Sequence, residues 1–248
     1  MSILDQAKPV FETVNSVNVL IHGDSGVGKT VFAGSGRGRG EKDLIIAVEK
    51  NGTISAARSG SKANVIQVST LDEFYEIITA IEDEPDRFEW VTVDSITKLQ
   101  DLIWSHILDE ATGKNPSRSK FKKELQEYGE AQERLKEIVE RLNNSDANIL
   151  WTAVSDLATD ENGNEFKMPS IHGKQGALAA WICAQMDTVI YLSVVARQNG
   201  KLGRLFQFDK TPEAYAKDRL QTFGPTAGNL SLADFTNKIL GVEEKPEA

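Results

Sequence analysis

The chain has 248 residues, with 28 Lys+Arg against 37 Asp+Glu for a formal net charge of −9, and 40% of its residues are hydrophobic. This length and composition are typical of a globular protein with a full core, and they exclude a disordered, collagenous or disulfide-stapled chain. The single Cys183 lies in an apolar stretch, so we expect a buried structural thiol and a reducing compartment.

No apolar run approaches the roughly 20 residues that a membrane-spanning helix needs. The first residues, Met1 to Asp5, lack the basic and apolar segments of a signal peptide. We therefore predict a protein outside the membrane that stays in the cytoplasm.

Short apolar runs rich in branched residues alternate with longer stretches of helical period, which predicts an α/β fold. The predicted strands are 17–22, 44–48, 64–67, 90–94, 148–154, 188–195 and 205–209. We expect the first five to be parallel and buried, and the last two to form an antiparallel hairpin through Gln198, Asn199 and Gly200.

Helices are predicted directly after Gly28 and over residues 71–81, 96–108 and 122–142. The last helix is predicted from apolar residues that recur at spacings of three, four and seven, namely Leu125, Tyr128, Leu135, Ile138 and Leu142. The glycine-rich stretch 34–40 predicts a mobile basic loop. We expect one domain over residues 1–241 and a disordered tail over 242–248.

The segment after the first predicted strand matches the P-loop pattern G-x-x-x-x-G-K-[ST]. Its residues are Gly23, Asp24, Ser25, Gly26, Val27, Gly28, Lys29 and Thr30. The glycines let backbone N–H groups surround a phosphate, Lys29 reaches the outer phosphates, and the Thr30 hydroxyl can hold Mg²⁺. The sequence therefore predicts a site for ATP and Mg²⁺. We expect His22, directly before the loop, to be a packing or hydrogen-bonding residue.

Two carboxylates are candidates to complete this site. Asp94 ends an alternating apolar run, and we expect it at the carboxyl edge of the sheet, on a strand beside the P-loop strand, where it would order the Mg²⁺ shell. A helix N-cap at Asp94 is compatible with that role. Glu49 follows strand 44–48, 20 residues after Lys29, and could activate water. The alternative for Glu49 is a solvated loop acid.

In this order, Lys29, the strand-terminal Glu49 and Asp94-Ser95 resemble the core of RecA-type ATPases. More narrowly, Glu49-Lys50-Asn51-Gly52, the run from Val93 to Leu99 and Ala216-Lys217-Asp218-Arg219 resemble short phage-encoded RecA-like P-loop ATPases, the phage nucleotide-binding proteins. Some members of that family are single-strand annealing recombinases. The resemblance spans residues 17–230 and implies a mainly parallel sheet flanked by helices, with a C-terminal antiparallel hairpin.

Lys217 and Arg219 are two residues apart, so on a strand both side chains point to one face. The resemblance implies that this pair enters a neighbouring subunit's site and stabilises charge on the transferring phosphoryl group. It thereby predicts a homo-oligomer, as a ring or a filament. The alternative is a surface charge cluster with Asp218.

The resemblance also implies that two loops contact single-stranded DNA. The first is the basic stretch 114–123, with five positive charges and no acid, for which a solvated helix start is the alternative. The second is the polar stretch 156–176, with Lys167, His172 and Lys174 as phosphate contacts, although its acidic residues 160–165 predict a hairpin turn. Where RecA-like proteins place a polar sensor, this chain has Thr152-Ala153-Val154-Ser155.

The P-loop and its carboxylates predict a Mg²⁺-dependent ATPase. The resemblance implies that it is RecA-like and acts on single-stranded DNA in phage recombination or annealing, in the cytoplasm of the host cell. The alternative is a nucleotide-dependent assembly or switch ATPase that binds protein partners and not DNA, which the net acidity slightly favours. A small-molecule kinase would need an arginine-bearing lid, and the order of Glu49, Asp94, Lys217 and Arg219 counts against it.

Overall fold

The computed structural model describes residues 16–119, 121–173, 176–197 and 200–240. Here one mixed, mainly parallel sheet has the strand order β10-β8-β7-β1-β5-β4-β2-β3, with β6 paired to β5 and β9 paired to β7. The strands are β1 (Asn18–Gly23), β2 (Leu44–Ala47), β3 (Asn64–Gln67), β4 (Trp90–Asp94), β5 (Asn148–Thr159), β6 (Glu165–Pro169), β7 (Thr188–Ala196), β8 (Leu202–Gln207), β9 (Lys217–Asp218) and β10 (Thr226–Gly228).

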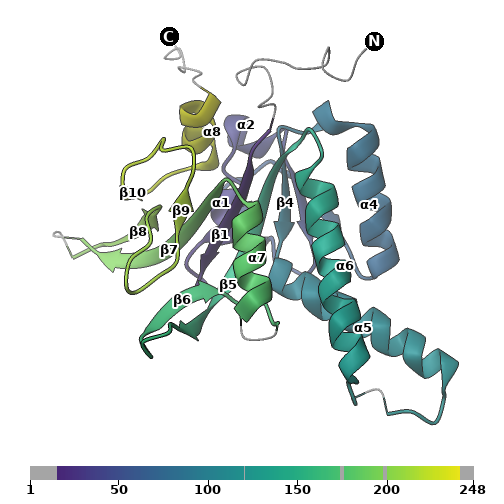
Figure 1. The fold of residues 1–248 in the computed structure, drawn as a ribbon. Coiled ribbons are helices and arrows are strands. Elements are labelled where there is room, and N and C mark those ends of the chain that lie inside the picture. The colour runs from purple at the N-terminus through teal and green to yellow at the C-terminus, as the bar shows by residue number, and fades with distance from the viewer. Residues whose placement is uncertain (1–15, 120, 174–175, 198–199, 241–248) are drawn as a thin grey trace, which may run out of the picture.

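Helices cover both faces of this sheet, which gives the molecule three layers (Figure 1). The helices are α1 (Lys29–Ala33), α2 (Arg37–Gly40), α3 (Ile54–Arg58), α4 (Leu71–Asp83), the 3₁₀ turn η3 (Pro85–Arg87), α5 (Ile96–Lys114), α6 (Leu125–Asn143), α7 (Ala177–Gln185) and α8 (Leu232–Leu240). Helices α4 to α7 pack on one face, and α1 and α8 pack on the other. The predicted α/β class, with a mainly parallel sheet flanked by helices, is confirmed.

Two apolar cores follow from the two-residue period of the strands. In β1, Leu20 belongs to the core under α4 to α7, whereas Val19 and Ile21 belong to the core under α1 and α8. Neighbouring residues of β2 divide in the same way, with Ile45 on one side and Ile46 on the other. Because both faces are covered, the central strands read as continuous apolar runs. The prediction of parallel, buried strands is confirmed for β1, β2, β4 and β5.

The third predicted strand is parallel but not buried. β3 pairs with β2 in parallel, and all four of its residues are exposed, with Val65 46% and Ile66 41% accessible. β3 is the last strand at its edge of the sheet, so it has one neighbouring strand instead of two. Its branched residues indicate a strand correctly, but the prediction of burial is wrong.

Antiparallel pairing is confirmed for the C-terminal hairpin of β7 and β8. Residues 198 and 199 of its turn lie outside the described residues, and β10 adds to β8 on the outer side. The acidic turn at 160–165 is also a hairpin, because β5 continues to Thr159 and pairs with β6. The Asp160 carboxylate caps this turn by accepting hydrogen bonds from the backbone N–H groups of Asn162 and Asn164.

The helix predicted from apolar spacing is present as α6, but only part of its apolar face is buried. Leu135, Ile138 and Leu142 are fully buried, but Leu125 is 88% exposed and Tyr128 is 47% exposed. Both lie in the first turns of α6, which project with the end of α5 away from the sheet (Figure 1). The periodicity predicts the helix, whereas burial depends on how far the sheet extends beneath it.

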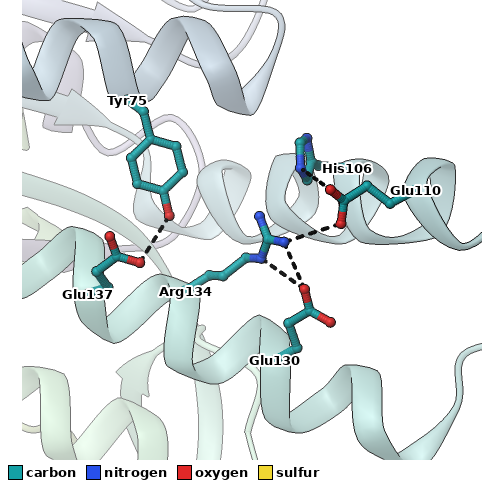
Figure 2. Close-up of polar contacts among 6 residues, drawn as sticks. All are labelled: Tyr75, His106, Glu110, Glu130, Arg134 and Glu137. Atoms are coloured by element: carbon teal, nitrogen blue, oxygen red, sulfur yellow. Dashed lines mark hydrogen bonds and ion pairs between the residues drawn. The ribbon is translucent and has the colours of Figure 1, made fainter.

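Polar contacts join the outer surfaces of α4, α5 and α6 (Figure 2). Arg134 of α6 donates a hydrogen bond of 3.2 Å to Glu110 of α5, which also contacts His106 at 3.5 Å. The Tyr75 hydroxyl of α4 donates to Glu137 at 3.3 Å. Such partly exposed contacts contribute at most about 1 kcal/mol each, so they align the helices more than they stabilise them.

The glycine-rich stretch 34–40 contains the helical turn α2 and is held by long-range contacts. Arg37 forms an ion pair of 2.9 Å with Glu89 and donates a hydrogen bond of 2.7 Å to Asn237 of α8. Gly38 and Arg39 have φ values of 58° and 65°, so the turn is not regular α-helix. The predicted loop thus contains an irregular helical turn, and the contacts of Arg37 tether it to residues distant in sequence.

Within the described residues, no helix is long and apolar enough to span a membrane. The predicted burial of Cys183 is confirmed, and burial raises the pKa of its thiol to about 12. The tail predicted over 242–248 lies outside the described residues.

Candidate functional site

The P-loop connects the carboxyl end of β1 to the N-terminus of α1. Its tight path depends on glycine, since Gly26 has a φ of 82° and Gly28 a φ of 109°, conformations that other residues rarely adopt. At Gly28 a side chain would in addition overlap the Arg204 guanidinium. At Gly23 a side chain would overlap the carbonyl oxygen of Leu192 on β7. The glycines thus serve both backbone conformation and close packing.

A cavity of about 310 Å³ opens beside this loop. Its lining residues are Ser25, Gly26, Gly28, Lys29, Thr30, Val31, Glu49, Gly52, Ser55, Asp94, Ser95, Val154 and Arg204. The structure therefore brings Lys29, Thr30, Glu49 and Asp94 to a single hollow at the carboxyl edge of the sheet. Lys217 and Arg219 are not among the residues that line it.

Lys29 is buried at the bottom of the loop, with 9% of its surface exposed. Its ammonium group donates hydrogen bonds to the backbone carbonyls of Gly23 at 2.8 Å and Asp24 at 2.9 Å. Burial lowers the pKa of Lys29 below its ordinary value, and the negative charges of Asp94 and Asp24 oppose that shift. A cation fixed in this way against the P-loop backbone can hold the oxygens of a polyphosphate.

Asp94 lies at the end of β4, and both of its carboxylate oxygens accept a hydroxyl hydrogen bond. The Thr30 hydroxyl donates to Oδ2 at 2.7 Å, and the Thr152 hydroxyl of β5 donates to Oδ1. The expectation that the Asp94 strand lies beside the P-loop strand is wrong, because β5 is inserted between β1 and β4. Thr152 bridges that gap, which sequence spacing could not show.

The Thr30 hydroxyl and the Asp94 carboxylate are hard oxygen donors held side by side. Such donors suit Mg²⁺, which typically takes one or two protein oxygens and completes its shell with water and phosphate. The residues present therefore fit a Mg²⁺ bound together with a nucleotide.

Glu49 lies two residues beyond the end of β2, where its side chain is exposed and lines the cavity. Because β2 neighbours β4, Glu49 and Asp94 come from adjacent strands at the same edge of the sheet. From this position the Glu49 carboxylate could accept a proton from a water molecule in the cavity.

His22 is fully buried at the end of β1, directly before the P-loop. Its Nε2 is 2.8 Å from the Tyr215 carbonyl, which can only accept, so Nε2 carries the proton and Nδ1 accepts from the Ser155 hydroxyl at 2.9 Å. Burial lowers the pKa of His22 to about 4, so the ring is neutral at pH 7. The predicted packing and hydrogen-bonding role of His22 is what the structure has.

The second proposed DNA loop contacts the P-loop through Lys167 of β6. The Lys167 ammonium forms an ion pair of 3.0 Å with the Asp24 carboxylate. Gln100 of α5 exchanges hydrogen bonds of 2.6 and 2.8 Å with the backbone of His172. Lys174 lies outside the described residues. Lys167 is thus engaged within the chain.

Lys217 and Arg219 lie at the C-terminal end of α7. Lys217 donates to the Cys183 carbonyl at 2.7 Å, and Arg219 donates to the Ala184 carbonyl at 3.0 Å, where cations are favoured by the helix dipole. Burial and the nearby Arg219 charge lower the pKa of Lys217.

The register of the sheet separates this pair from the chain's own P-loop. Lys217 pairs with Val189, and Val189 pairs with Leu20 of β1. Asp24 lies four residues further along, roughly 13 Å at 3.3 Å per strand residue. The two cations therefore lie toward the opposite edge of the sheet.

The basic stretch 114–123 continues α5 to Lys114 and then forms a loop. Arg118 forms an ion pair of 2.6 Å with Glu127, and the Lys123 ammonium lies 4.0 Å from the centre of the Trp104 ring. Lys120 lies outside the described residues. Part of the positive charge expected for DNA is thus paired locally.

Both proposed DNA loops border one groove of about 1130 Å³. Its lining includes Lys123, Leu125 and Tyr128 from the first loop and the start of α6. Asp156, Leu157 and His172 line it from the second loop. We call this hollow the α6–β6 groove.

Two residues make contacts with the site that no local sequence pattern indicates. Arg204 reaches the P-loop from β8, and its Nε donates to the Val27 carbonyl at 2.9 Å across 177 positions of the chain. Thr152 stands where the resemblance implies a sensor, and its hydroxyl is used by Asp94. Only the pairing of strands reveals either contact.

Comparisons with known proteins give a family for most of the chain. A profile of the family described as AAA domain matches residues 15–220. The comparison with curated proteins finds no significant match.

Several solved structures are similar to this chain at low sequence identity. A KaiC-like protein from Pyrococcus horikoshii has 15% identity and a TM-score of 0.44, with 79% of each chain covered. The flagellar accessory protein FlaH from Methanocaldococcus jannaschii has 12% identity and a TM-score of 0.40, covering 87% of this chain and 90% of that one. An uncharacterized protein from Pyrococcus horikoshii, in complex with an unknown peptide, has 11% identity and a TM-score of 0.43, covering 79% and 84%.

Proposed function

The chain belongs to the AAA domain family of P-loop ATPases, and we propose that it binds and hydrolyses Mg²⁺·ATP as a RecA-like homo-oligomer acting on single-stranded DNA. The observation that carries the ATPase part is the cavity that Lys29, Thr30, Glu49 and Asp94 line together. Those residues supply a phosphate-binding cation, two oxygen donors for a metal and a carboxylate, which is the set that phosphoryl transfer to water requires.

Each of these residues has a distinct task in the proposal. Lys29 and the glycine N–H groups hold the phosphates, while Thr30 and Asp94 would hold Mg²⁺. When bound, Mg²⁺ neutralises charge on the phosphates. Glu49 orients a water molecule and accepts its proton, and Thr152 keeps the Asp94 carboxylate in one orientation.

Lys217 and Arg219 are proposed to act in the site of a neighbouring subunit. Their location toward the sheet edge opposite the P-loop supports this assignment, since they are poorly placed for their own cavity. A contact between one subunit's β9 region and the next subunit's P-loop is heterologous, so it generates a ring or a filament. In that setting Arg219 stabilises the charge that develops on the γ-phosphoryl group.

Single-stranded DNA is the proposed partner. The protein would act on it in phage recombination or annealing in the host cytoplasm. The α6–β6 groove supports this because it joins the two loops that the resemblance implies for DNA. Lys123, Tyr128 and His172 there offer positive charge and rings to a single strand.

A protein partner is the second candidate, favoured by exposed apolar side chains at the same groove. Leu125 and Leu157 line it and are 88% and 55% exposed, and Phe121, in the preceding loop, is 95% exposed. Asp101 and Asp156 add negative charge, which is unfavourable for DNA. In this case ATP would drive assembly or switching without nucleic acid.

Phosphate release from Mg²⁺·ATP, with and without single-stranded DNA at low and moderate salt, separates these candidates. DNA stimulation that weakens with salt supports the DNA proposal, because phosphate contacts release counterions. Turnover that is indifferent to DNA favours a protein partner. Absence of turnover with and without DNA would contradict the proposed hydrolysis.

A complementation experiment tests the residues. Lys29→Ala should abolish ATP binding, whereas Arg219→Ala should retain binding and lose turnover, with the surface variant Arg87→Ala as a control. If Arg219 acts on a neighbour, mixing the two inactive variants in equal amounts should restore activity to about a quarter of wild type, because an intact P-loop meets an intact Arg219 in that fraction of random head-to-tail contacts. No recovery from a mixture that co-assembles would refute action between subunits, and ATP binding by Lys29→Ala would refute the site.

A further inference from the structure

Arg204 is a cationic side chain at the P-loop that the proposed function does not use. Its Nε donates to the Val27 carbonyl, and it lines the same cavity as Lys29 and Thr30. A Cβ built on Gly28 would lie 2.9 Å from both Cζ and Nη2 of Arg204, so the guanidinium rests directly on the loop backbone. Within the described parts of the chain, no carboxylate forms an ion pair with it.

The sheet fixes this position through register. His22 pairs with Tyr191 of β7, and Val194, three residues further on, pairs with Arg204 of β8. The β7–β8 hairpin therefore extends past the end of β1 and alongside the P-loop. On its other side, the Arg204 backbone exchanges hydrogen bonds of 3.1 and 3.3 Å with Asn229. The backbone is thus held from both neighbours.

The two-residue period of β8 sets the direction of the side chain. Phe206 shares a face with Arg204, and its ring lies 5.2 Å from that of Phe32 on α1. Arg204 consequently points to the face that carries α1 and the P-loop. Both its position and its direction follow from the fold of the strand rather than from a flexible loop.

We propose that Arg204 is a nucleotide-binding residue that contacts the phosphates nearest the nucleoside, and this inference rests on the proposed ATP-binding function. A guanidinium has a planar fork of donors, so Nε can keep its bond to Val27 while the terminal amines donate to phosphate oxygens. The P-loop and its ligand would then share one cation that is supplied by the same subunit.

The end of the nucleotide that Arg204 meets follows from strand order. β4 and β2, which position Asp94 and Glu49, lie on one side of β1, whereas β7 and β8 lie on the other. If hydrolysis occurs beside Asp94 and Glu49, the phosphate that leaves lies on their side. Arg204 then meets the part of the ligand that ATP and ADP share.

Equilibrium binding of ATP and of ADP to the full chain, together with steady-state turnover, tests this assignment. Arg204→Gln should weaken the affinity for both nucleotides by about tenfold or more, as expected for a lost charge-assisted hydrogen bond. Turnover at saturating ATP should change less than twofold. Arg197→Gln is the matched control, because Arg197 lies on the same hairpin against Gly203, away from the cavity. If Arg204→Gln lowers the unfolding midpoint, the same binding and turnover measurements are made on Arg204→Lys, which keeps the charge.

The outcomes are distinct. Unchanged affinities for both nucleotides would overturn the inference, and a loss confined to ATP would place Arg204 at the γ-phosphate and overturn it as well. A parallel fall in affinity and in saturated turnover would mean that Arg204 only supports the loop, since a distorted loop also displaces Lys29 and Thr30. If wild-type protein binds neither ATP nor ADP, the proposed function itself fails. If wild-type protein binds nucleotide and Arg204→Gln gives any of the three preceding results, only the role proposed for Arg204 is refuted.

Discussion

Replacing the buried Asp43 by asparagine should change the pH dependence of folding. Asp43 precedes β2, is 0% exposed and is enclosed by the glycine-rich turn, where a side chain at Gly36 would overlap its carboxyl group. Neither carboxyl oxygen has a hydrogen-bond partner of good geometry within the described residues. Burial and the nearby Glu89 charge raise the pKa of Asp43 from 3.8 to about 7, and the Trp90 backbone N–H opposes this only in part.

The size of the effect follows from the two pKa values. Between pH 3.8 and 7 the folded protein retains a proton that the unfolded chain has released, so the stability that this group contributes falls as pH rises. Each pH unit changes the folding equilibrium about tenfold, so the full gap of about three units corresponds to about 4 kcal/mol. The asparagine side chain of the variant cannot ionise. The stability of Asp43→Asn relative to wild type should therefore rise by that amount from pH 4 to pH 8.

Urea unfolding followed by tryptophan fluorescence at pH 4, 6 and 8 measures this difference. Subtracting wild type from variant at each pH cancels the other titrating groups, and Asp86→Asn, at an exposed position, controls for the change in net charge. A difference between Asp43→Asn and wild type that stays constant from pH 4 to pH 8 would refute the argument that Asp43 is buried without compensation.

Three further predictions concern the cavity and its surroundings. Gly28→Ala should weaken ATP binding at least about tenfold, because a φ of 109° is strained for alanine and the added methyl group meets Arg204. Gly113→Ala in α5, where the methyl group has open space, should leave binding intact. Equal affinities of the two variants in a nucleotide-binding assay would contradict this prediction. Thr152→Val should raise the Mg²⁺ concentration that half-saturates turnover, because the Asp94 carboxylate loses a hydroxyl donor. Thr92→Val is the control and should not raise it, since it removes a buried hydroxyl without a partner among the described residues. An unaltered Mg²⁺ titration for Thr152→Val would count against the proposed metal site. Lys167→Ala should lower the free energy of unfolding by less than about 1 kcal/mol, because its ion pair with Asp24 is partly exposed. The same variant should keep its affinity for single-stranded DNA. A loss of that affinity would show that Lys167 does contact DNA.

Much of the fold could be predicted because local patterns encode it. The limits of β3 and β4 agree with the sequence prediction, and the P-loop glycines predict the turn between β1 and α1. The alternation of apolar residues also gives the parallel central strands and the C-terminal hairpin. Burial was predicted less well, since Leu125 and Tyr128 have the spacing of a buried helix face but lie where α6 projects beyond the sheet.

The candidate site divides in the same way. The amino-acid sequence by itself determined the P-loop, because eight consecutive residues specify its backbone geometry, and it thereby predicts Lys29 and Thr30 as phosphate and metal residues. It also singled out Asp94 and Glu49 from the strands that precede them. Only the tertiary structure decided that β5 lies between β1 and β4, so that Thr152 meets Asp94 across 58 positions of the chain, and that Arg204 meets Val27 across 177. These contacts depend on which strands pair and in which register. That choice is made by the burial of both faces of the whole sheet, and no local pattern records it.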